Sequence, residues 1–132
     1  MVTKKNIAIF SISIVVLIVV ALFFLRIPED SWIKDSKGIW IKHGMPTMIP
    51  DYVREQQLAV DCAMAFYNNA SSKNMSFSSR CLGTCGNYSV DIVNVPRMSE
   101  DNLAENQCPE YISKETKSFI ELYKSGDIVR IV

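Results

Sequence analysis

The sequence predicts an α+β fold, in which an N-terminal transmembrane helix precedes a small antiparallel sheet with one main helix packed on it. Three observations lead to this prediction: residues 7–25 are uncharged and apolar, two pairs of β-like segments flank glycine-containing turns, and four cysteines follow the apolar run. We expect disulfides to brace the domain. The predicted parts are a cytoplasmic tail at 1–6, an anchor at 7–25, a linker at 26–31 and an exported α+β domain at 32–132.

The apolar run begins at Ile7 and ends at Leu25, and it has about the length that an α-helix needs to cross a bilayer core. Lys4 and Lys5 precede it, so the positive-inside rule predicts a cytoplasmic N-terminus and an extracytoplasmic C-terminal domain, periplasmic or extracellular. A cleaved signal peptide is the alternative, but residues 22–25 continue the apolar character past the only weak cleavage position. We therefore predict a single-pass protein of the cell membrane that contacts the lipid bilayer through this run.

The charge of the exported part excludes one class of partner. The whole chain carries 14 basic and 14 acidic residues. Three of the basic residues flank the apolar run, which leaves the part from Ile27 onward mildly acidic. Nucleic-acid binding needs clustered positive charge, so we expect no nucleic-acid partner.

The four cysteines are Cys62, Cys81, Cys85 and Cys108. An even number in a small exported domain predicts two disulfides. Spacing leaves all three pairings open, and we favour long-range bridges that join the 81–85 segment to Cys62 and to Cys108, in either arrangement. The alternative is an exported thiol-redox or metal-handling protein that acts through Cys81 and Cys85. A second close pair of ligands is missing, so we predict neither a metal site nor a cofactor.

A hairpin is predicted from residues 32–34 and 39–42, because Gly38 in the intervening turn can adopt a left-handed conformation. Alternation places Trp32 and Trp40 on one face of this hairpin. These two rings are candidates for a binding surface for a sugar or a peptide, and they equally suit a membrane interface near the anchor. His43, which follows the second strand, is the third candidate of this surface, although a role as a turn residue explains it as well.

The main helix is expected from about Asp51 to Tyr67, with Pro50 at its first turn. Cys62 lies on a ridge beside the polar strip of this helix, so a bridge from it is expected to strap a loop over the back of the helix rather than enter the main core. The serine-rich residues 68–80 are expected to form a surface loop.

The rest of the chain predicts a strand at 88–95, a short helix from Ser99 to Glu105, and a hairpin with strands at 118–123 and 127–131. Because the segments between strands look like hairpin turns rather than helical crossovers, we expect an antiparallel sheet. The oxygen-rich residues 100–106 lack the spacing of a calcium loop and are interpreted as a solvated helix start.

Three asparagines match the acceptor pattern for N-glycosylation, namely Asn69, Asn74 and Asn87, although a segment rich in Asn and Ser produces this pattern by chance as well. The sequence contains no nucleophile elbow, phosphate-binding glycine loop or paired His-Glu motif, so we predict no catalytic residue and no enzyme. The function that remains is a membrane-anchored domain that binds a protein or a cell-wall component.

Overall fold

The computed structural model describes residues 14–20 and 30–132. The predicted tail, most of the predicted anchor and most of the predicted linker lie outside the described residues. Residues 14–20 are helical and exposed. Among the helices that the structure describes, none combines the length and the apolar character that crossing a membrane requires.

Residues 30–132 form an α+β fold with two sheets and two disulfides. In the first sheet, β1 (Ser31–Lys34) pairs antiparallel with β2 (Trp40–His43). The second sheet has the order β3 (Arg80–Cys85), β4 (Tyr88–Ile92), β5 (Ser118–Leu122) and β6 (Ile128–Ile131). The hairpins predicted around Gly38 and Gly126 are therefore both present.

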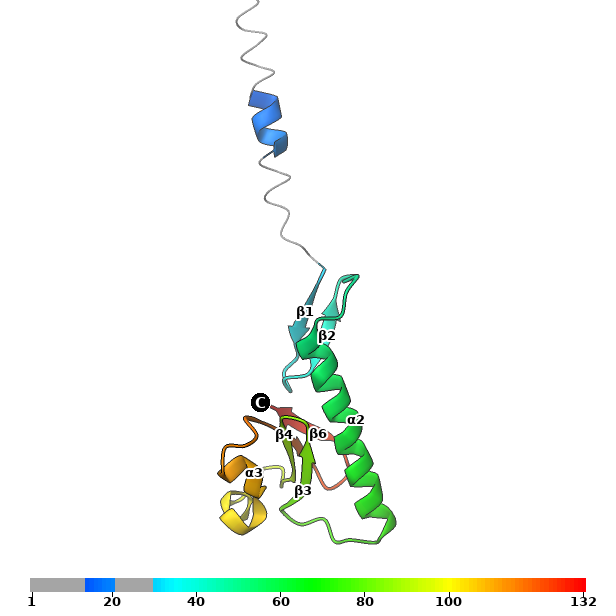
Figure 1. Ribbon diagram of the computed structural model, residues 1–132, viewed down its shortest axis with the longest axis vertical. Helices are drawn as coiled ribbons and strands as arrows, with labels where there is room; N and C mark the ends of the chain where they lie inside the picture. The colour runs from blue at the N-terminus through cyan, green and yellow to red at the C-terminus, as the bar shows by residue number, and fades with distance from the viewer. Residues whose placement is uncertain (1–13, 21–29) are drawn as a thin grey trace, which may run out of the picture.

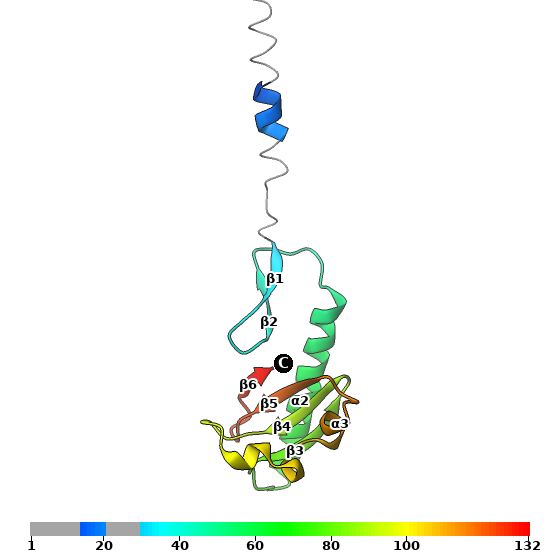
Figure 2. The same ribbon diagram turned by 90° about the vertical axis from the view of Figure 1, so that its left-hand side faces the viewer.

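The four-stranded sheet lies between two layers of different kinds (Figures 1 and 2). The long helix α2 (Asp51–Ser72) packs on one face, and residues 93–117 cross the other. This crossover contains three short helical elements: η1 (Ser99–Asn102), η2 (Ala104–Asn106) and α3 (Pro109–Ile112). The short helix predicted from Ser99 to Glu105 is thus replaced by two 3-10 turns.

The sheet is antiparallel at its two hairpins and parallel at its centre, which the sequence did not predict. Strands β4 and β5 run in the same direction, with Tyr88 opposite Ser118 and Ile92 opposite Leu122. A parallel pair requires a crossover of a dozen or more residues, and residues 93–117 supply it without a long helix. Because this crossover lacks helical periodicity, its sequence does not reveal that it returns the chain to the same end of the sheet.

Helix α2 continues to Ser72, five residues beyond the end that the sequence predicts. The last turn is retained because Ala70 is buried there, with 7% of its surface exposed. The predicted loop at 68–80 was therefore wrong at both ends, since its first residues belong to α2 and Arg80 begins β3.

The core lies between α2 and the sheet. The small side chains of Ala59 and Ala63 allow the helix to approach the strands closely, as the sequence predicts. At Gly83 the approach leaves no room for a side chain, because a Cβ atom there would lie 2.9 Å from the ring of Phe66. The other buried members of this core are Cys85, Val90, Ile92, Ile120, Leu122 and Ile131.

A buried glutamine helps to fix the β1–β2 hairpin to the rest of the domain. The side chain of Gln56 on α2 is 2% exposed; it accepts a hydrogen bond from the Trp40 backbone N–H (2.8 Å) and donates one to the Gly38 carbonyl (2.9 Å). The turn of the hairpin also contacts β6, where the Ile131 N–H donates to the Lys37 carbonyl (2.7 Å). The hairpin is therefore held in one position relative to the main sheet.

Candidate functional site

Both candidate tryptophans lie on one face of the β1–β2 hairpin. The register places Trp32 opposite Lys42 and Trp40 opposite Lys34, so that rings and ammonium groups alternate on this face. The Lys42 ammonium lies 5.8 Å from the Trp32 ring centroid, and that of Lys34 lies 5.2 Å from the Trp40 ring centroid. The third candidate, His43, is exposed at the end of β2.

The hairpin continues into an exposed apolar loop that the sequence analysis did not single out. Met45 and Met48 are 84% and 79% exposed, and the Trp32 indole N–H donates to the Met48 carbonyl (2.9 Å). We call this region the aromatic–methionine surface; it surrounds a hollow of about 360 Å³ and comprises Trp32, Met45, Pro46, Met48 and Tyr52. Methionine adapts its shape to irregular apolar partners, so this surface is suited to contact rather than to catalysis.

The four cysteines form two long-range disulfides, Cys62–Cys85 and Cys81–Cys108. This confirms the predicted class of pairing and settles which cysteine joins which. Because Cys81 and Cys85 are bonded to different partners, they do not form the paired thiol site of the alternative hypothesis.

The bridge from Cys62 occupies a different place from the one that the sequence suggests. Its partner Cys85 is 2% exposed and belongs to the core cluster, so the bridge joins α2 to the sheet inside the core. The predicted strap over the back of the helix was wrong, because Cys85 ends a strand beneath α2 and not a surface loop.

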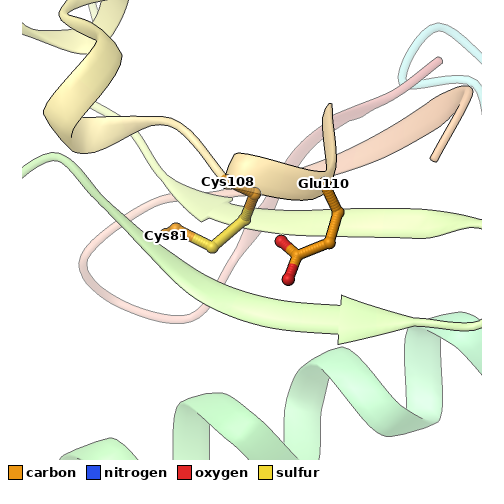
Figure 3. A group of neighbouring side chains, drawn as sticks. All are labelled: Cys81, Cys108 and Glu110. Carbon is orange, nitrogen blue, oxygen red and sulfur yellow. A yellow bond between two sulfur atoms is a disulfide. The ribbon is translucent and has the colours of Figure 1, made fainter. Parts of the chain in front are cut away.

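One group of side chains has the composition of a metal site. The sulfur atoms of Cys81 and Cys108 and a carboxylate oxygen of Glu110 lie within 4.8 Å of one another, and Figure 3 shows the Glu110 side chain beside the disulfide. Both sulfur atoms are bonded to each other, so neither is a thiolate and only the carboxylate can act as a ligand. In this oxidised form the group is a disulfide with an acidic neighbour.

A groove runs beside the other disulfide, between α2 and the turn that joins β3 to β4. It has a volume of about 370 Å³, and its lining includes Glu55, Leu58, Cys62, Cys85 and Tyr88. Leu58 is 63% exposed, which is a large fraction for a leucine on a helix that packs on a sheet. The walls of this groove are fixed to each other by the Cys62–Cys85 bond.

A row of charged side chains crosses the face of the sheet that lies under the crossover. Asp91 on β4 is opposite Glu121 on β5, which is in turn opposite Arg130 on β6. The side chain of Glu121 is only 4% exposed, and its carboxylate forms ion pairs with Arg130 and with Arg97 from the crossover. Arg97 also donates to the Asp101 carbonyl (3.3 Å), so this ion-pair network ties the crossover to the sheet.

Burial, together with the neighbouring Glu121 carboxylate, raises the pKa of Asp91 to about 6. The positive charge of Arg97 and a hydrogen bond from the Cys108 backbone lower the pKa of Asp91, but they do not outweigh burial. The Cys108 Sγ atom, 3.0 Å from Asp91 Oδ1, carries no proton in the disulfide and donates no hydrogen bond. The folded chain therefore holds the proton of Asp91 more tightly than the unfolded chain does.

Replacing Asp91 with asparagine is expected to stabilise the protein at neutral pH. Between the ordinary aspartate pKa of about 3.9 and the raised pKa of about 6, the folded chain holds a proton that the unfolded chain releases, so the free energy of unfolding falls as pH rises through this window. We expect D91N to exceed the parent by about 1 to 3 kcal/mol at pH 7.5 and by little at pH 4. Urea unfolding of the full chain in detergent at both pH values measures this, with D61N on the exposed side of α2 as control. An equal gain at both pH values would contradict this prediction.

The oxygen-rich segment at 100–106 is only partly solvated. Asp101 is 3% exposed, and its carboxylate accepts the backbone N–H groups of Met98 (2.7 Å) and Asn94 (3.1 Å). Although burial acts to raise the pKa of Asp101, these hydrogen bonds outweigh it and hold the pKa below its usual range. The interpretation of this segment as a solvated helix start was therefore wrong at Asp101. Its buried carboxylate accepts backbone N–H groups at and before the start of η1.

The three candidate glycosylation asparagines are all exposed but lie in different settings. Asn69 is in the last turns of α2 rather than in a loop, Asn74 has a left-handed backbone with φ of 51°, and Asn87 is in the β3–β4 turn. Modification of these side chains stays a prediction.

Sequence reasoning identified Trp32 but missed the methionines beside it, the groove and the ion-pair network. The signal for the first was available, since Met45 and Met48 stand in a proline-interrupted segment where regular structure cannot bury them. No protein-family model, curated protein or solved structure matches this chain, so the function must be argued from these surfaces.

Proposed function

We propose that this protein is a single-pass membrane protein whose residues 32–132 form an extracytoplasmic, disulfide-stabilised binding domain. The observation that carries the proposal is the oxidation of all four cysteines into two disulfides that connect separate elements of the fold. Such bonds persist in oxidising compartments outside the cytoplasm, and the run from Ile7 to Leu25 has the composition of an anchor that would hold the domain there.

The groove beside the Cys62–Cys85 bond is the proposed contact surface for the protein or cell-wall partner that the sequence analysis predicts. Its mainly apolar lining includes a few polar groups, the usual character of a recognition site. Because a disulfide fixes its walls, little ordering is needed when a partner binds. Leu58, the one leucine of α2, is 63% exposed and is the side chain such a partner is expected to cover.

The test introduces charge into the apolar run and follows both location and thiol state. In V16R/V19R, two arginines replace apolar residues near the centre of the run, where each opposes membrane insertion by about 2.5 to 3.5 kcal/mol. We expect the parent chain to resist alkaline extraction from membranes and to have four protected cysteines. The variant is expected to appear in the soluble fraction with alkylatable thiols. The control T3R places an arginine before the run and is expected to behave as the parent. Free thiols in a parent chain that resists extraction would overturn the extracytoplasmic assignment.

A further inference from the structure

We infer that the aromatic–methionine surface rests in the headgroup layer of the bilayer that holds the anchor. The inference depends on the proposed function, because it requires the run ending at Leu25 to span the membrane. It adds a second membrane contact, made by the folded domain itself, which fixes how the domain stands on the bilayer.

The first argument is the length of chain between the two membrane contacts. Asp30 follows Leu25 by five positions in the sequence, and a fully extended chain over five positions spans about 17 Å at most. Asp30 is in turn bound to the loop, since its Oδ1 accepts the Met45 backbone N–H at 2.8 Å. An anchor that ends at the edge of the hydrocarbon core therefore keeps this loop close to the lipid headgroups.

The second argument is the composition of the surface. Its two most exposed side chains, Met45 and Met48, are apolar, and neighbouring Ile49 is 45% exposed. Trp32 and Tyr52 stand beside them, and tryptophan and tyrosine are the residues that concentrate at membrane interfaces. The apolar parts can enter the acyl boundary while the peptide groups and nearby charges stay among the headgroups.

The third argument concerns rigidity. Two hydrogen bonds hold the backbone of the loop in place: the Trp32 indole N–H donates to the Met48 carbonyl, and Asp30 Oδ1 accepts the Met45 N–H. The hairpin beneath is fixed by Gln56. The apolar side chains are therefore held outward on a rigid support, which lowers the ordering cost of inserting them.

Charge does not supply the attraction, because the hairpin and the loop carry both signs. Between residues 30 and 51 the three lysines at 34, 37 and 42 are matched by the three aspartates at 30, 35 and 51. A bilayer of zwitterionic phosphatidylcholine should therefore be sufficient, and the contact should be insensitive to salt.

The experiment uses the full chain reconstituted into phosphatidylcholine vesicles, with and without bromine atoms at a shallow acyl position. W40F leaves Trp32 as the only tryptophan, and W32F leaves Trp40. Trp40 lies opposite Lys34, two strand positions from Trp32 toward the hairpin turn, and packs on Tyr52 (ring centroids 4.7 Å apart). We expect brominated lipid to remove at least half of the Trp32 fluorescence and clearly less of the Trp40 fluorescence. Adding M45S/M48S to W40F should at least halve the quenching, whereas L58S should leave it unchanged.

The outcomes separate the inference from the function on which it depends. If the chain stays with the vesicles after an alkaline wash but Trp32 is not quenched, the anchor stands and the inference is wrong. If M45S/M48S leaves the quenching of Trp32 unchanged, the methionine loop is not the contact and the inference is likewise wrong. If the chain does not associate with vesicles, the proposed anchor and the inference both fail. Preferential quenching of Trp32 that depends on the methionines supports both.

Discussion

Replacing Cys62 and Cys85 together by alanine is expected to lower the free energy of unfolding by about 3 kcal/mol. The bond closes a loop with a sequence separation of 23 residues, and constraint of the unfolded chain by a loop of this length accounts for most of that value. Alanine is preferred to serine, because Cys85 is 2% exposed and a hydroxyl there would be buried without a partner.

The second disulfide provides a matched comparison. Cys81–Cys108 has a sequence separation of 27 residues, so the loop-entropy argument predicts a loss within a few tenths of a kcal/mol of the first. The variant without any of the four cysteines is expected to lose about 6 kcal/mol, a large part of the about 5 to 15 kcal/mol of stability that a domain of about 100 residues has in total.

Denaturant unfolding of both double variants in detergent, followed by far-UV circular dichroism, measures these losses. A loss below about 1 kcal/mol for both bonds would mean that they do not brace the fold. That result would direct attention back to thiol chemistry at Cys81 and Cys85.

The elements that the sequence predicted well have local signals. Gly38 and Gly126 both have positive φ angles in the turns of predicted hairpins, and Pro50 marks the start of α2. These residues act through their own backbone preferences, so no knowledge of distant neighbours is needed. The pair Gly86-Asn87 is a comparable turn signal between β3 and β4, and it was overlooked because the cysteines around it were interpreted only as bridge or ligand candidates.

Strand β3 was missed for a different reason. Its sequence, RCLGTC, contains a glycine and only one β-branched residue, Thr84, so its intrinsic strand propensity is low. Tertiary contacts hold it in place. Cys81, near one end, is bonded to Cys108, and Cys85, at the other end, is bonded to Cys62. Between them, Gly83 has no side chain and so leaves room for the ring of Phe66. Propensity alone cannot predict a strand that depends on cross-links.

The ion-pair network was beyond sequence reasoning for a reason of topology. No motif includes Asp91, Glu121 or Arg130. Each lies in a strand where polar and apolar residues alternate, so each looks in the sequence like an ordinary solvent-facing residue. They meet because β4 and β5 pair in parallel, and Glu121 is buried because the crossover at 93–117 covers that face. Both facts follow from the path of one irregular segment.

Glu121→Gln is the substitution expected to show whether this network supports the fold. Glutamine keeps the shape of the side chain but removes the charge that both Arg97 and Arg130 face. Breaking a fully buried pair costs about 3 to 5 kcal/mol, but these arginine side chains are 37% and 46% exposed and can recover some hydration. We therefore expect a loss of about 2 to 3 kcal/mol at pH 7.5, measured by urea unfolding of the full chain in detergent.

The two arginines should not contribute equally. Arg130 pairs with Glu121 across one hairpin, with Nη2 3.1 Å from Oε1, so its partner is close by the register of the strands alone. Arg97 bonds Glu121 from a segment 24 residues away and also holds Asn102 Oδ1 at 3.2 Å, so its removal also frees the crossover. A double-mutant cycle should therefore give a larger coupling for E121Q with R97Q than with R130Q. Because Glu121 also raises the pKa of Asp91, E121Q should move the pH-dependent loss of stability to lower pH. An unchanged pH profile would show that the Glu121 charge does not contribute to the raised pKa of Asp91.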